Sequence, residues 1–170
     1  MADSYDTAIQ AARRDAAGNE HAVLIQDTGW PGYTEVPGWV VQDYATLLHE
    51  IDGQLAECGI IGPGVLAVPV GVGSLAQAAV AHFRGRSATG YCSILSVEAD
   101  SAACLVASLS AGHPVSVQTG FTVMSGLNCG TPSALAWPVL SKGLDAAIAV
   151  SDVQAIRAEG PCPDALTVAA

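Results

Sequence analysis

A strand-to-helix turn is the feature that most constrains how this chain folds. The stretch VPVGVGSLAQA, residues 68–78, passes from an uncharged apolar run through Gly71 and Gly73 into residues that favour a helix. Such a turn is typical of α/β proteins, in which the helix that follows a strand presents free backbone N–H groups at its first turn. Those groups attract anions, so the turn predicts a phosphate site without saying which phosphate it holds.

Three apolar runs define the predicted sheet. The runs Val65–Val70, Ser93–Val97 and Ala146–Val150 show no alternation of apolar and polar residues. Strands of that kind are buried on both faces, as in a parallel sheet. The sequence therefore predicts an α/β fold with a Rossmann-like parallel sheet and helices on both of its faces.

Helical spacing of apolar residues fills the intervals between these runs and the region before them. One further short buried strand, HAVLIQ, is expected over His21–Gln26. The predicted helices cover Ser4–Ala16, Trp39–Cys58, Ser74–Phe83, Ser101–Ser110 and Pro132–Lys142. No internal repeat or linker interrupts the pattern, so residues 1–158 are expected to form one domain, followed by an irregular tail over residues 159–170.

Composition excludes several classes of partner. The chain has 170 residues, of which 51% are hydrophobic and 13% charged, enough to bury one substantial core. Sixteen acidic residues against six basic ones give a net charge of -10, which repels nucleic acid and anionic membrane surfaces. We therefore expect neither nucleic acid nor a membrane as a partner.

The cysteines and the uncharged stretches bear on the compartment. The five cysteines are scattered, without a C-x-x-C pair or a nearby histidine at zinc-site spacing, so neither a metal site nor a disulfide framework is expected. Residues 58–81 carry no charge, but Pro63 and Pro69 break the stretch into two elements, which a membrane span does not tolerate. No export signal begins the sequence, so a reducing cytoplasmic setting is expected.

Local sequence leaves three interpretations of the glycine turn open. Gly71-x-Gly73-x-x-Ala76 satisfies a loose dinucleotide fingerprint, and Glu98 ends the next strand near the distance at which an acid would bind a ribose hydroxyl. Glu98 is equally suited to cap the following helix. Alternatively the glycines only permit a tight turn in which Ser74 caps the helix, with no ligand at all.

Four stretches carry a resemblance to a known family. They are QDTGWPGYTEVPGWVVQDYATL at residues 26–47, VGVG at 70–73, SVEAD at 96–100 and MSGLNCGTPSALAWPVL at 124–140. Together they resemble the diaminopropionate ammonia-lyases, which are fold-type II enzymes that use pyridoxal 5'-phosphate. The resemblance runs in one register from about Tyr5 to Asp152, and QDTGWPGY is its most distinctive motif.

The resemblance implies roles for the glycine turn and for one carboxylate. Gly71, Val72, Gly73, Ser74 and Leu75 match the loop that holds the phosphate of the cofactor, pyridoxal 5'-phosphate. Asp27 matches a carboxylate of the substrate site, where it would pair with a substrate ammonium or carry a proton near Cα; the alternative is that it only caps a turn.

The resemblance also gives expectations for neighbouring side chains. Trp30 and Tyr33 would wall the site, with plain packing as the alternative. Cys104 and Cys129 fall where some relatives carry a cysteine pair that can bridge, and two free buried thiols are the expected state in a reducing cell.

The departures from the family concern its lysine. The cofactor's covalent anchor in that family is a lysine in a segment that matches nothing here, and the single lysine of this chain, Lys142, stands where the family leaves a residue to solvent. The parent activity would be elimination of ammonia from 2,3-diaminopropionate to give pyruvate and ammonia. We expect this chain to be a central to C-terminal fragment of such an enzyme, inactive alone on its small amino-acid substrate. A homo-oligomer and a complementing chain that carries the lysine both remain open as partners.

Overall fold

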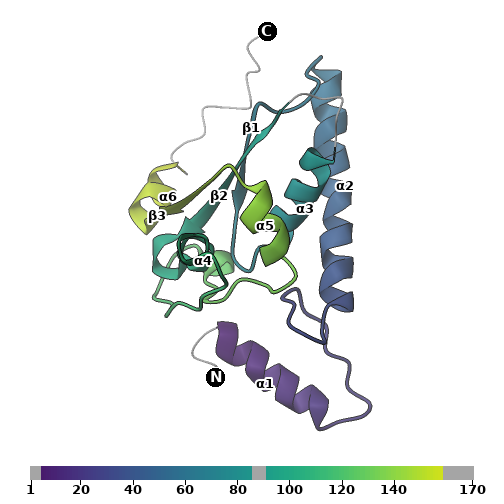
Figure 1. Cartoon of the computed structure of the whole chain (residues 1–170), viewed down its shortest axis with the longest axis vertical. Helices are drawn as coiled ribbons and strands as arrows, with labels where there is room; N and C mark the ends of the chain where they lie inside the picture. Colours follow the sequence, from purple (N-terminus) through teal and green to yellow (C-terminus); the bar gives the residue numbers. More distant parts are fainter. Residues whose placement is uncertain (1–4, 86–90, 159–170) are drawn as a thin grey trace.

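The computed structural model describes residues 5–85 and 91–158, and a three-stranded parallel sheet lies at its centre (Figure 1). The strands β1 (Val65–Pro69), β2 (Ser93–Ala99) and β3 (Ala146–Val150) stand side by side in that order. In the register of the sheet, Val65 is opposite Ser93, and Leu95 is opposite Ala146. The predicted parallel α/β arrangement is therefore confirmed, and all three predicted strands of the sheet are present.

Six α-helices accompany the sheet. The longest, α2, packs along α3, and α5 also packs against α3. Short 3-10 turns occupy Asp100–Ala102 and Ser125–Leu127. The helices are α1 (Tyr5–Ala17), α2 (Glu35–Glu57), α3 (Ser74–Arg84), α4 (Cys104–Ala111), α5 (Trp137–Gly143) and α6 (Asp152–Ala158).

The core lies on one face of the sheet. Val68 is 4% exposed, and Ile94 and Ser96 are fully buried on the same face. Leu105 of α4 and Leu140 of α5 are also fully buried and belong to this core. Both crossovers between strands step in the same direction, and because such crossovers are right-handed, both connections fall on this one face.

The other face of the sheet, which we call the open sheet face, is covered much less. None of its residues is buried, and those of β1 are exposed along the whole strand. Within residues 5–85 and 91–158, the cover that the sequence predicts on both faces is therefore complete on only one. The open sheet face consists of Val65, Ala67, Pro69, Ser93, Leu95, Val97, Ala146, Ile148 and Val150.

The strand predicted over His21–Gln26 is not formed. The segment is extended, but no strand in the described ranges lies beside it, and Val23 and Ile25 are 79% and 75% exposed. Its backbone is held instead by the Tyr33 hydroxyl, which donates to the Leu24 carbonyl at 2.8 Å and accepts the Gln26 N–H at 3.2 Å. The prediction was wrong because an apolar run becomes a strand only when another strand completes its hydrogen bonds.

Two predicted helices begin later than expected. The helix predicted from Ser101 starts at Cys104, because residues 100–102 form a 3-10 turn first. The helix predicted from Pro132 starts at Trp137, since residues 132–136 turn across the top of α3 and only Pro138 sits in the helical first turn, where proline is tolerated. The irregular tail predicted over residues 159–170 lies outside the described residues.

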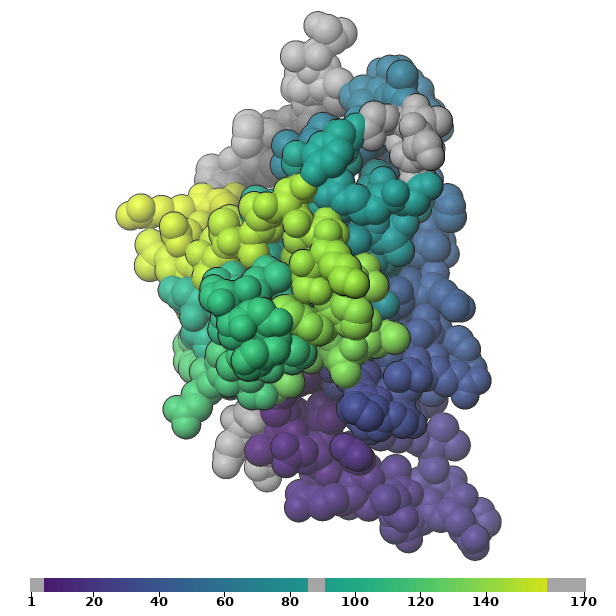
Figure 2. Space-filling view, in the orientation of Figure 1, coloured from purple at the N-terminus to yellow at the C-terminus, as the bar shows by residue number. Residues whose placement is uncertain are grey.

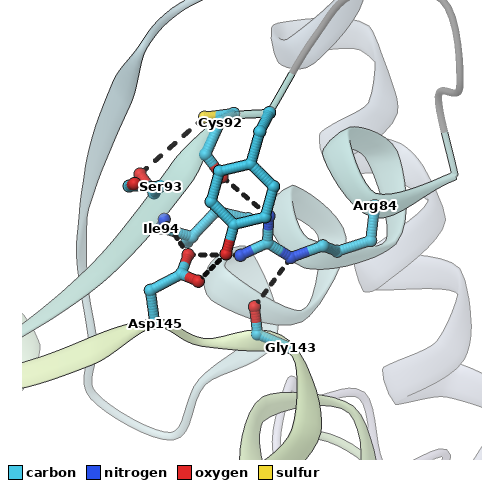
Figure 3. A network of polar contacts seen from close by, with 7 residues as sticks. Arg84, Cys92, Ser93, Ile94, Gly143 and Asp145 are labelled. Atoms are coloured by element: carbon cyan, nitrogen blue, oxygen red, sulfur yellow. Dashed lines mark hydrogen bonds and ion pairs between the residues drawn. The ribbon is translucent and has the colours of Figure 1, made fainter.

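One arginine ties three elements together at the edge where the strands begin (Figure 3). The Arg84 guanidinium, at the end of α3, donates to the carbonyl of Gly143 at 3.0 Å and to that of Cys92 at 2.7 Å. It also pairs with Asp145, whose carboxylate accepts the Ile94 N–H at 2.7 Å and the Tyr91 hydroxyl. The hydrogen bonds from Tyr91 and Ile94 hold the pKa of Asp145 below its ordinary value. This Arg84 cluster joins α3, β2 and the turn between α5 and β3.

Helix α1 lies at the end of the molecule opposite this cluster (Figure 2). Two of its first side chains reach the rest of the chain: the Tyr5 hydroxyl donates to Asp27, and the Asp6 carboxylate accepts the Gly130 N–H at 3.0 Å. None of the residues of α1 is buried. Polar contacts at its first turn therefore contribute most to holding α1 in place.

Candidate functional site

The glycine turn stands between the end of β1 and the start of α3. Gly73 has φ +101°, a left-handed conformation that residues with a Cβ rarely adopt. A Cβ at Gly73 would meet Leu140 Cδ1 at 2.8 Å, and one at Gly71 would meet Cys129 Sγ at 3.0 Å. Close packing therefore requires glycine at both positions, and at Gly73 the backbone conformation requires it as well.

The N–H groups of this turn are uncommitted. In the described part of the chain, no hydrogen bond consumes the amide of Gly71, Val72, Gly73, Ser74 or Leu75. The Ser74 hydroxyl does not cap α3, as one interpretation of the sequence had it, but donates to the Asp27 carbonyl at 3.1 Å. An eleven-residue helix thus begins with a row of unpaired donors, which is the arrangement that attracts an anion.

A cavity of about 180 Å³ opens beside the turn. The structure brings Asp27 and all five residues predicted for the cofactor phosphate to this cavity. No lysine or arginine lines it, so an anion bound there would depend on main-chain N–H groups and the positive end of the α3 dipole. The complete lining is Tyr5, Asp27, Tyr44, Pro69, Gly71, Val72, Gly73, Ser74, Leu75, Gly126, Leu127 and Cys129.

Asp27 is held by a tyrosine that sequence reasoning did not assign to the site. The Tyr5 hydroxyl donates to Asp27 Oδ1 at 2.7 Å, and burial followed by this hydrogen bond raises the pKa of Tyr5. The Asp27 side chain therefore faces the cavity and its tyrosine partner, and its carboxylate caps no turn of its own. Tyr5 stands 22 residues before Asp27 on another element, so no local motif marks it.

Trp30 and Tyr33 do not line the cavity. Their rings stack with centroids 4.4 Å apart, and the Arg13 guanidinium lies 4.7 Å from the centroid of the Trp30 ring. The hydroxyl of Tyr33 is occupied by the backbone of Leu24 and Gln26. Both aromatic residues therefore hold the loop that carries Asp27, which is the packing alternative to the expected wall.

Cys104 and Cys129 are buried free thiols near the turn. Burial raises the pKa of Cys104 well above its ordinary range, and raises that of Cys129 to about 12. Cys104 Sγ lies 3.7 Å from the Gly71 carbonyl oxygen, so both sulfurs pack against the glycine turn. Two protonated buried thiols behave as packing groups rather than nucleophiles.

Glu98 caps a helix. Its carboxylate is fully buried and accepts the N–H groups of Leu105 at 2.8 Å and Val106 at 2.7 Å, which belong to the first turn of α4. Burial raises the pKa of Glu98, and these two hydrogen bonds partly oppose the shift. With both oxygens engaged in this way, Glu98 is not available to a ribose, which removes the acidic residue from the dinucleotide interpretation.

Other chemistry receives no support from the geometry of residues 5–85 and 91–158. No group of three or more histidine, cysteine, aspartate or glutamate side chains in these ranges has the arrangement of a metal site. Nor does any helix there combine the length and the apolar character that crossing a membrane requires. Lys142 lies exposed on α5 and does not line the cavity.

Comparison with known proteins points to one family. The model of the pyridoxal-phosphate dependent enzymes matches residues 1–160. A diaminopropionate ammonia-lyase from Salmonella typhimurium is 36% identical over 157 residues, which cover 91% of this chain and 39% of the relative. The chain therefore belongs to the family of pyridoxal-phosphate dependent enzymes, and it spans about two fifths of the length of that relative.

Solved structures give the same result. The diaminopropionate ammonia lyase of Escherichia coli in complex with an aminoacrylate–PLP azomethine intermediate superposes with a TM-score of 0.76 at 30% identity, over 87% of this chain and 37% of that one. A threonine deaminase from T.th. superposes with a TM-score of 0.63 at 25% identity, over 70% of this chain and 42% of that one. The expected resemblance is confirmed, and pyridoxal phosphate is the cofactor that it indicates.

Proposed function

We propose that this chain is the phosphate-holding part of a pyridoxal-phosphate-dependent ammonia-lyase that acts on 2,3-diaminopropionate. The observation that carries the proposal is the row of uncommitted N–H groups over residues 71–75, beside a cavity that also contains Asp27. Family membership and the 36% identity to a diaminopropionate ammonia-lyase support the reaction and its products, pyruvate and ammonia. The buried free thiols are consistent with a reducing cytoplasmic setting.

The residues of the cavity suit the cofactor's phosphate. The N–H groups of Gly71, Val72, Gly73, Ser74 and Leu75 would hold the dianion at the start of α3, as helix N-termini do. When bound, pyridoxal phosphate supplies an electron sink for the carbanion at the substrate's Cα. Close packing of the two glycines against Leu140 and Cys129 keeps the turn in place before any ligand arrives.

Asp27 is the proposed catalytic residue. Its carboxylate would pair with an ammonium group of the diamino acid or carry a proton near Cα, because it is the only acidic side chain on the cavity among the described residues. The hydrogen bond from Tyr5 keeps Oδ1 oriented and leaves Oδ2 for the substrate. Small amino acids with a second amino group are therefore the proposed substrates.

The anchoring lysine must come from another polypeptide under this proposal. Lys142 is the only lysine among the 170 residues, and it is exposed on α5 away from the cavity. A second copy of this chain would offer the same misplaced lysine. We therefore propose that the isolated chain does not turn over diaminopropionate and that a complementing chain supplies the lysine.

Phosphorus-31 NMR tests the phosphate cradle without requiring turnover. The purified chain is titrated against pyridoxal 5'-phosphate, with NAD and inorganic phosphate in parallel, and pyridoxal without phosphate serves as a competitor. We expect a bound phosphorus signal for pyridoxal 5'-phosphate that pyridoxal does not abolish, since the phosphate is the group recognised. Phosphorus observation also ignores adventitious reaction of the aldehyde with Lys142.

The variant Gly73→Ala provides the site test. A methyl group there meets Leu140 and strains the left-handed backbone, so affinity for the phosphate should fall about tenfold or more. Gly64→Ala is the matched control, because a Cβ there meets nothing within 4 Å. A signal from NAD alone, or equal binding by both variants, would overturn the assignment of this turn to pyridoxal phosphate.

A further inference from the structure

The open sheet face is uncharged and largely apolar. Parallel register brings Val65, Leu95 and Ile148 from three different strands to the same side of the sheet. Val65 is 67% exposed and Ile148 is 42% exposed, although both belong to strands. Of the residues that define this face, Ser93 alone is polar, and none carries a charge.

A bare face of this kind is unusual for a parallel sheet. Parallel sheets occur almost only with both faces covered, because their crossover connections and neighbouring helices bury them from two sides. Here both crossovers fall on the side of Val68 and Ile94, which leaves the opposite side without that cover. Contiguous exposed apolar surface on a soluble protein marks an interface.

We propose that the open sheet face binds the apolar side of helices in the polypeptide that carries the remainder of the pyridoxal-phosphate-dependent enzyme. This inference rests on the proposed function, because it identifies the complementing chain's docking surface. In the Escherichia coli structure the match covers 37% of the chain, so most of that protein lies outside the part that resembles this one. A polypeptide of that extent has the residues to cover the face.

Charge separates this occupant from a second copy. Each chain carries a net charge of -10, so two copies repel each other as they approach face to face. The face itself offers no basic residue that could offset this repulsion. Its chemistry fits an uncharged helical surface, which carries no such penalty.

The open sheet face is continuous with the candidate site. Pro69, at the end of β1, belongs to the face and also lines the cavity beside Gly71. A polypeptide docked on the face therefore reaches the margin of the cavity. That position is where a lysine from the complementing chain has to arrive.

The test uses the unmatched remainder of the Salmonella typhimurium enzyme, produced without the 157 residues that correspond to this chain. Association with the full chain is measured by sedimentation velocity and by titration calorimetry. Hydroxyl-radical footprinting with mass spectrometry then reports the reactivity of Val65 and Ile148 with and without the probe. We expect both side chains to become protected only when the probe is present.

Val65→Asp is the diagnostic variant and Val23→Asp its control. Both positions are exposed, at 67% and 79%, and both receive the same new charge, but Val23 lies off the sheet in the 21–26 segment. Val65→Asp should weaken association about tenfold or more, because the charge must be buried against an apolar surface, and Val23→Asp should leave it unchanged. Circular dichroism and thermal unfolding establish that the diagnostic variant retains its fold.

Three results would overturn the inference. They are no association with the probe, association that leaves Val65 and Ile148 as reactive as before, and protection that develops with rising concentration of the chain alone, which would assign the face to a second copy. The phosphorus titration described above is independent of these readouts. A chain that binds the cofactor phosphate and fails here retains its proposed function and loses only this surface.

Discussion

Tyr5 shows how a single hydroxyl connects the first helix to the candidate site. It donates to Asp27, which in turn offers its main-chain carbonyl to the Ser74 hydroxyl at the start of α3. The loop that carries Asp27 is thereby fixed from two sides. Loss of either bond frees the carboxylate to leave the cavity.

Tyr5→Phe should therefore lower the free energy of unfolding by about 1–2 kcal/mol, the usual range for a hydrogen bond to a charged group that is only partly buried. The measurement is urea denaturation at pH 7 followed by circular dichroism. Tyr44→Phe is the matched control, because Tyr44 lines the same cavity and, among the described residues, its hydroxyl has no hydrogen-bond partner. Equal stability of the two variants would contradict the role given to Tyr5.

Residue-scale prediction from sequence worked where the signal was local. Gly71 and Gly73 could be identified because a glycine pair between a strand and a helix has a physical reason within a few residues. Tyr5 and Cys129 could not, since they reach the cavity across 22 residues in one case and from a distant loop in the other. The roles of Asp27 and of residues 71–75 in binding remain proposals.

Helix α4 depends on a buried carboxylate for its first turn. Glu98 leaves β2 and accepts two N–H groups that the helix cannot satisfy itself. Because the side chain is fully buried, no water can replace it.

Glu98→Ala should destabilise the protein by about 2–4 kcal/mol, since it leaves two buried donors unpaired and opens a cavity. Hydrogen exchange followed by mass spectrometry should show the amides of Leu105 and Val106 losing protection first. Glu98→Gln keeps one acceptor oxygen and should lose less stability than Glu98→Ala. If residues 104–111 exchanged no faster in Glu98→Ala than in the native chain, the cap would contribute nothing to α4.

Element-scale prediction depended on whether an element is complete within the described chain. The three strands of the sheet were predicted because each finds a parallel neighbour. The apolar run over residues 21–26 has a similar composition but no neighbour, so it stays extended and unpaired. Helix starts at Cys104 and Trp137 were misplaced because a 3-10 turn and a prolonged loop precede them.

At the scale of the whole molecule, the Arg84 cluster closes the edge of the sheet farthest from the glycine turn (Figure 3). Asp145 takes part through both carboxylate oxygens, and its pKa lies below the ordinary value. A carboxyl with a lowered folded pKa contributes stability above its unfolded pKa, near 3.9, and that contribution is lost as the pH falls towards the folded value.

Asp145→Asn should therefore reduce stability at pH 7, and the difference between the variant and the native chain should shrink as the pH is lowered through about 4. Thermal unfolding between pH 3 and pH 7 measures both effects. Asp43→Asn on the exposed surface of α2 is the control and should show no such convergence. A constant difference across the whole range would mean that Asp145 acts through shape alone.

The bareness of the glycine turn of positive side chains has a consequence for acidity. A nest of peptide dipoles has no proton of its own to gain or lose near neutrality, unlike a pocket built from lysine or histidine. Any anion resting against α3 would then bring its own ionisation to the equilibrium, and a phosphate monoester changes from mono- to dianion near pH 6. How tightly such a guest is retained across the physiological range would accordingly be set by the guest and scarcely by the host.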